Sequence, residues 1–133
     1  MRLSATDAHR HSAIPRTRYA FLTLPDYSMI ALTNAIEPLR MANRVSGQSA
    51  YEWLVVSTDG EPVTASNGLM MPPTTRLADA PDVDMVFVCG GVNVREAVSP
   101  ALVNVLRRLA ARRMPLGALC TGGYALAQAG LLD

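Results

Sequence analysis

The sequence has few aromatic residues and few cysteines, no long apolar run and almost no excess of either charge. Aromatic residues make up 5% of the 133 residues, and the cysteines are Cys89 and Cys120 alone. Two cysteines exclude a disulfide-rich secreted scaffold and are typical of a reducing cytoplasm. No apolar run approaches the roughly 20 residues of a membrane span, so we expect no membrane association. The net charge of +1 gives this segment no electrostatic means of holding nucleic acid by itself.

Motifs for phosphate and metal binding are also missing. The sequence contains neither GxGxxG nor GxxxxGK[ST], and it has no CxxC and no HExxH. The only histidines are His9 and His11, both close to the N-terminus. The sequence therefore predicts no cofactor and no metal site.

The sequence has enough apolar residues for one globular domain, which is preceded by a polar N-terminal tail. Half of the residues are hydrophobic, and the length fits a single domain. Residues 1–17 carry several arginines and no apolar segment of the kind found in secretion signals. We predict a disordered tail there and a folded domain over residues 18–133. A mitochondrial presequence is the alternative for the tail, against which Asp7 and the lack of a long amphipathic face count.

The folded part alternates between strand and helix patterns. Apolar runs predict strands at 19–24, 51–57, 84–88 and 115–119. Helices are predicted from Ser28 to about residue 45, from Ser99-Pro100 onward, and from 122 to about 129. Residues 61–73 are predicted to form a short antiparallel hairpin outside the main sheet, with its turn at Asn67-Gly68. Residues 74–81 are predicted to form a loop with at most one helical turn. This order predicts an α/β fold, a parallel sheet with helices on both faces.

The strongest chemical signal is Leu119-Cys120-Thr121-Gly122, at a predicted strand-to-helix junction. Small residues on either side of Cys120 permit the tight turn of a nucleophile elbow, with cysteine in place of serine. The start of the following helix would favour the thiolate. The alternative is that Cys120 is a small buried hydrophobic residue. Catalysis would further require a base, and no histidine follows the elbow.

Other candidate residues also leave two interpretations open. Cys89 ends a strand and is either packed there or within reach of Cys120. Gly90-Gly91 either brings backbone close to a ligand or forms a turn. Glu37 is either a buried acid near the site or a surface residue. Four arginines of one helix either contact DNA or form a solvated face near the negative end of the helix dipole; they are Arg107, Arg108, Arg112 and Arg113.

Several stretches together resemble the DJ-1/PfpI superfamily (class I glutamine amidotransferase-like), and more narrowly the N-terminal sensor domain of AraC-family transcription regulators. The likeness covers about residues 18–133. The stretches that carry it are FLTLPDYS at 21–28, AIEPLRMAN at 35–43, SNGL at 66–69, VCGG at 88–91, GALCTG at 117–122 and AGLLD at 129–133.

The resemblance implies a flavodoxin-like domain with Cys120 at the elbow. It also implies a small-molecule effector, with an amino acid or a quaternary amine as the possible class, a homodimer in the cytoplasm, and DNA binding by a C-terminal helix-turn-helix domain that is absent here. Enzymes of the superfamily pair the cysteine with an acid and often a histidine; the matching positions here hold Ala31 and Thr121. These departures favour a non-catalytic sensor.

Three functions follow as hypotheses. The first is the sensor, with a pocket formed where the strands end. The second is a Cys-dependent hydrolase or hydratase with Cys120 as nucleophile. The third is an inactive remnant, since members of the regulator family continue past the Leu-Leu-Asp stretch and the fold here looks truncated. The predicted pocket residues are Asp26, Tyr27, Ser28, Cys89, Gly90, Gly91, Cys120, Thr121 and Gly122.

Overall fold

The structure, a computed structural model, describes residues 15–132. The predicted tail lies mostly outside the described residues. The first strand, β1, begins at Thr17, one residue before the predicted domain start. Arg16 already forms an ion pair with Glu52 on the neighbouring strand.

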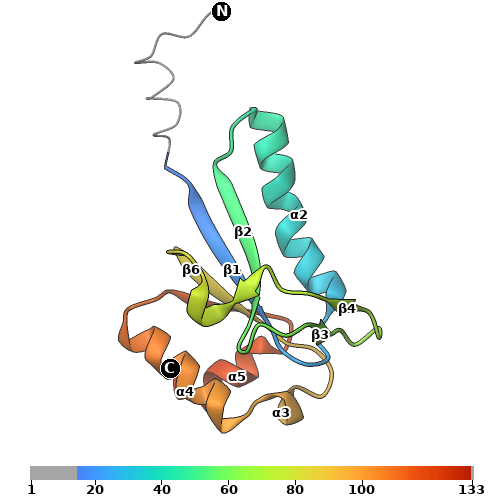
Figure 1. The fold of residues 1–133 in the computed structure, drawn as a ribbon, viewed down its shortest axis with the longest axis vertical. Coiled ribbons are helices and arrows are strands. Elements are labelled where there is room, and N and C mark those ends of the chain that lie inside the picture. Colours follow the sequence, from blue (N-terminus) through green and yellow to red (C-terminus); the bar gives the residue numbers. More distant parts are fainter. Residues whose placement is uncertain (1–14, 133) are drawn as a thin grey trace, which may run out of the picture.

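The core of the fold is a five-stranded parallel sheet with the order β5-β2-β1-β6-β7 (Figure 1). A separate antiparallel pair, β3 and β4, forms the predicted hairpin around Asn67-Gly68. The predicted α/β class and the parallel sheet are thus confirmed. In chain order the elements are β1 (Thr17–Thr23), α2 (Met29–Ser46), β2 (Tyr51–Ser57), β3 (Val63–Thr64), β4 (Met70–Met71), β5 (Thr75–Arg76), η1 (Leu77–Asp79), β6 (Met85–Cys89), α3 (Val94–Ala97), α4 (Pro100–Ala111), β7 (Leu116–Leu119) and α5 (Gly122–Gln128).

Both faces of the sheet are covered, because strand side chains alternate between the two faces. On β1, Ala20 and Leu22 point into the cluster formed with α4 and α5, whereas Phe21 points into the cluster beneath α2. Leu106 of α4 and Leu32 of α2 are fully buried centres of these two clusters. Because β6 pairs in parallel with both β1 and β7, the carboxyl ends of these three strands lie at one edge of the sheet.

Local signals fix the helix starts. The Ser28 hydroxyl accepts a hydrogen bond from the amide of Ala31, and the Ser99 hydroxyl accepts one from Leu102. Gly47 ends α2 in the left-handed conformation. Pro38 lies inside α2.

Two short elements were not predicted. Residues 74–81 were expected to form a loop with at most one helical turn, and η1 is that turn, but Thr75 and Arg76 also extend the sheet by pairing with Val56 and Ser57 of β2. The one-turn helix α3 was not expected either. Both elements are too short for hydrophobic periodicity, and tertiary contacts with neighbouring segments define them. Within residues 15–132, no helix has the length and apolar character of a membrane span.

Candidate functional site at the carboxyl edge of the sheet

Cys120 lies in the sharp turn between β7 and α5 that the sequence predicts. Its φ of 53° is in the left-handed region, which a cysteine rarely adopts. The turn is tight because α5 approaches β6 closely: a Cβ on Gly122 would lie 1.9 Å from the carbonyl oxygen of Val88. The Cys120 side chain is exposed. The interpretation of Cys120 as a buried core residue is therefore wrong, and its thiol is presented to solvent at the strand edge.

Gly90 and Gly91 bring the neighbouring loop against this turn. A Cβ on Gly90 would lie 2.7 Å from both the Gly122 nitrogen and the Thr121 hydroxyl oxygen. The Thr121 hydroxyl donates a hydrogen bond to the Gly91 carbonyl at 2.6 Å. A Cβ on Gly91 would lie 2.2 Å from the Asp26 carbonyl oxygen. Other protein atoms, mostly backbone, therefore occupy the space next to these glycines, which gives them a packing role; contact with a ligand stays a prediction.

The segment before α2 completes the cluster. The Ser28 amide donates to the Gly90 carbonyl at 3.0 Å, and the Asp26 carboxylate accepts from the Asn93 side chain at 3.3 Å. Tyr27 is fully buried, and its hydroxyl has no hydrogen-bond partner in the described residues. The structure thus brings together the three segments of the predicted pocket, residues 26–28, 89–91 and 120–122.

The two cysteines differ sharply in environment. Cys89 is fully buried, and its thiol faces the Phe87 carbonyl at 3.6 Å. Burial raises the pKa of Cys89 from 9.0 to about 12. Burial, with a smaller contribution from Cys89, also raises the pKa of Tyr27. Both cysteines are free thiols, so no disulfide joins Cys89 to Cys120.

We predict that the buried thiol makes the domain less stable at alkaline pH. In the unfolded chain Cys89 ionises near pH 9, whereas in the folded chain it stays protonated up to about pH 12. Between these values the folded state holds more protons, so the free energy of unfolding falls as pH rises, by about 1.4 kcal/mol per pH unit. Urea unfolding at pH 8, 9 and 10 measures this slope. The Cys89→Ala variant should flatten it between pH 9 and 10; an unchanged slope would assign the loss to other groups.

Residues 15–132 contain no histidine that could act as a base for Cys120. Glu37 is exposed and pairs with Arg40, which lowers the pKa of Glu37 through their hydrogen bond, so its surface interpretation holds. Among the described residues, no group of three or more histidine, cysteine or acidic side chains is placed to hold a metal ion.

A cavity of about 500 Å³ lies at the ends of β1 and β2, and Asp26 is one of its lining residues. We call it the acidic cavity, because its lining includes Asp26, Asp59, Glu61 and Glu96 but no arginine or histidine. Only Asp26 was among the predicted pocket residues. Asp59 and Glu61 lie in the loop after β2 and Glu96 lies in α3; the Asp59-Gly60 turn after β2 was the sequence signal that could have drawn attention to this edge. Other lining residues are Thr23, Leu24, Pro25, Ser57, Thr58, Pro62, Val63, Thr64, Ala97, Ser99 and Leu102.

The four arginines near the end of α4 do not form one surface. The Arg107 guanidinium donates to the Ala129 carbonyl at 3.0 Å and so ties α4 to the end of α5. Arg108 and Arg112 line a second cavity. The helix ends at Ala111, so the prediction that Arg112 and Arg113 lie inside its last turns is wrong. The end comes early because Arg113 adopts a left-handed conformation, with a φ of 61°.

Comparison with known proteins identifies the fold. The DJ-1/PfpI family model matches residues 20–133. The chain belongs to the DJ-1/PfpI family. This DJ-1/PfpI domain is 48% identical over 113 residues to the HTH-type transcriptional regulator GbdR of Pseudomonas aeruginosa, covering 85% of this chain and 31% of the regulator. It is 44% identical over 113 residues to the HTH-type transcriptional regulator CdhR of the same species, covering 85% of this chain and 33% of that protein.

Solved structures agree with this assignment. An AraC-family transcriptional regulator from Pseudomonas putida superposes with a TM-score of 0.76 at 33% identity, over 88% of this chain and 63% of that one. DJ-1beta of Drosophila melanogaster shares the fold, with a TM-score of 0.66 at 24% identity over 86% of this chain and 61% of that one. The chain spans about a third of the length of the regulators GbdR and CdhR.

Proposed function

We propose that this DJ-1/PfpI domain is the ligand-sensing and dimerisation part of an AraC-type transcription regulator, without catalytic activity. Its likeness to several such regulators supports a regulatory role. DNA binding would belong to a helix-turn-helix part outside the matched region, as the greater length of the relatives suggests. Such a regulator works in the cytoplasm, where Cys89 and Cys120 stay reduced.

The charge of the acidic cavity is the observation from which we infer the chemical class of the ligand. Four carboxylates line it without a cationic side chain, so a positively charged ligand would compensate them. The volume of about 500 Å³ is typical of a small-molecule site. We infer that the effector carries an ammonium group, as an amino acid or a quaternary amine does. Of the predicted pocket residues, Asp26 would then contact the effector, while residues 89–91 and 120–122 lie outside the lining of the acidic cavity.

A homodimer is part of the proposal. The α2 helix leaves three large apolar side chains exposed, at 71% for Ile30, 45% for Met41 and 81% for Val45. Exposed apolar residues on one helix are typical of a surface that meets another protein. Ligand binding regulates only if it favours one arrangement of the dimer over the other, which requires different affinities for the two.

Calorimetric titration with choline tests the ligand class, with 3,3-dimethyl-1-butanol as the neutral compound of the same shape. We expect choline to bind at least about tenfold more tightly than the neutral compound. The double variant Asp26→Asn/Glu96→Gln should lose most of this preference, and the matched control Glu37→Gln should keep it. Equal binding of both compounds, or binding of neither, would contradict the proposed ligand class.

A Cys-dependent hydrolase or hydratase is the second candidate. The exposed thiol of Cys120 in a turn with positive φ favours it. The isonitrile hydratase of Pseudomonas putida is 32% identical over 114 residues, 85% of this chain and 47% of that enzyme. Against it stand Ala31 and Thr121 at the positions where enzymes of the family carry the acid and often the histidine. Turnover of an isonitrile that Cys120→Ser abolishes would favour this function over the sensor.

A further inference from the structure

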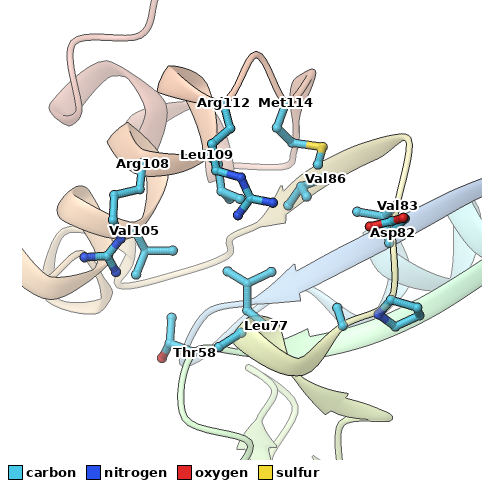
Figure 2. Close-up of a pocket in the computed structure, with 13 residues that line it drawn as sticks. Thr58, Leu77, Asp82, Val83, Val86, Val105, Arg108, Leu109, Arg112 and Met114 are labelled. Carbon is cyan, nitrogen blue, oxygen red and sulfur yellow. The ribbon is translucent and has the colours of Figure 1, made fainter.

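A second cavity, of about 480 Å³, lies on the face of the sheet that carries α4 and α5. It is bounded by α4 on one side and by the segment 77–83 on the other (Figure 2). Cys120 and the glycines of the elbow do not line it. We call it the arginine cavity. Its lining residues are Thr58, Leu77, Ala78, Ala80, Pro81, Asp82, Val83, Val86, Val105, Arg108, Leu109, Arg112 and Met114.

The floor of the arginine cavity is apolar. Val86 of β6 is fully buried and Leu109 of α4 is 8% exposed, while Leu77 is half-buried on the opposite wall. Figure 2 shows Leu77 pointing across the gap toward α4. Such a floor between a helix and the sheet gives an aliphatic or aromatic group a place out of water.

The rim carries an excess of positive charge. Arg108 and Arg112 are one helical turn apart, and both are exposed. Among residues 15–132, neither guanidinium forms an ion pair. By contrast, Arg40 and Arg76 are each paired with a carboxylate three residues away. Asp82, on the loop that leads into β6, is the one carboxylate of the lining (Figure 2), which leaves a net charge of +1 there.

We propose that the arginine cavity binds an organic anion, a monocarboxylate with an apolar chain or ring. Its carboxylate would pair with Arg108 and Arg112, whose guanidinium groups match carboxylate geometry. Its apolar part would lie on Val86, Leu109 and Leu77. The acidic cavity has the opposite charge, so the two cavities select ligands of opposite sign. The two cavities share Thr58 and no other lining residue, so the anion site is distinct from the proposed effector site.

Octanoate, below its micelle concentration, is the probe for this site, and calorimetry on the whole chain is the measurement. Octylamine has the same tail with a positive head, and butanoate has the same head with a short tail. We expect octanoate to bind at least about tenfold more tightly than either compound. Equal binding of octanoate and octylamine would overturn the proposal, since a nonspecific apolar patch gives that result.

Variants locate the site. Arg108→Gln/Arg112→Gln should weaken octanoate binding at least about tenfold, because both charged partners of the carboxylate are lost. The matched control Arg44→Gln removes an exposed arginine from α2, on the other face of the sheet, and should change affinity less than about twofold. Circular dichroism confirms that each variant is folded. Unchanged octanoate binding in the double variant would overturn the proposal. So would octanoate binding that weakens as protein concentration rises, since a second copy would then occupy the cavity.

Choline binding separates this proposal from the proposed function. The double variant should bind choline as the unaltered chain does, because neither arginine lines the acidic cavity. Loss of octanoate binding with choline binding intact would support both proposals. Failure of choline to bind would count only against the effector class and would leave the octanoate result to decide the anion site.

Discussion

Replacing Gly122 by alanine is expected to destabilise the domain by about 3 kcal/mol or more, the upper range for overpacking a rigid site. The added Cβ would lie 1.9 Å from the carbonyl oxygen of Val88, so α5 would have to move away from β6. Backbone cannot rotate aside as a flexible side chain can. Thermal unfolding should show the loss as a fall in melting temperature of about 10 °C.

The neighbouring glycine supplies the control. A Cβ on Gly123 would meet only the Ala118 Cβ, at 3.9 Å, which is an ordinary contact. Because Gly123 lies in α5, Gly123→Ala should stabilise the domain by about 0.5 kcal/mol through reduced freedom of the unfolded chain. If the two variants unfold at similar temperatures, the close approach of α5 to β6 is not what positions the elbow.

The second large effect is expected in thiol chemistry. At neutral pH, iodoacetamide should label Cys120 quickly and Cys89 at least about a thousandfold more slowly. Cys120 is exposed, whereas Cys89 is fully buried with a pKa of about 12, which leaves very little thiolate. Mass spectrometry of the intact chain over time should therefore show one label added well before the second.

Single-cysteine variants assign the two phases. Cys120→Ser should remove the fast label, and Cys89→Ala should keep it. If fast labelling survives in Cys120→Ser, the burial of Cys89 in the cluster beneath α2 is wrong. The experiment also bears on the enzyme alternative, since a reactive Cys120 without turnover supports a domain that keeps the elbow but not the chemistry.

Much of the architecture could be predicted from sequence because its signals are local. The apolar strands are continuous, and Ser28, Ser99 and Gly47 mark helix ends in the way their side chains and backbone dictate. The elbow could also be placed, because small residues around Cys120 permit a positive φ. The family resemblance was confirmed by the match over residues 20–133.

What escaped prediction depends on distant contacts. Strand β5 has two residues and exists because Thr75 and Arg76 meet the end of β2. The acidic cavity joins carboxylates from three segments, the loop after β1, the loop after β2 and helix α3, and no spacing along the chain relates Asp26 to Glu96. One interpretation of Gly90 and Gly91 was that they let backbone approach a ligand. In the structure, the space where their side chains would lie is filled by Thr121, Gly122 and Asp26. The sequence was enough to predict that Asp26, Gly90 and Gly91 lie at the carboxyl edge of the sheet. Which atoms each of them contacts depends on tertiary packing and could not be predicted.

The most direct test of the sensor account is to locate choline on the domain by amide chemical shifts. The account predicts shifts concentrated at the residues that line the acidic cavity, above all Asp26, Asp59, Glu61 and Glu96. Amides near Arg108 and Arg112 should stay unchanged. Shifts confined to the arginine cavity, or none at saturating choline, would contradict an effector site for organic cations at the carboxyl edge of the sheet.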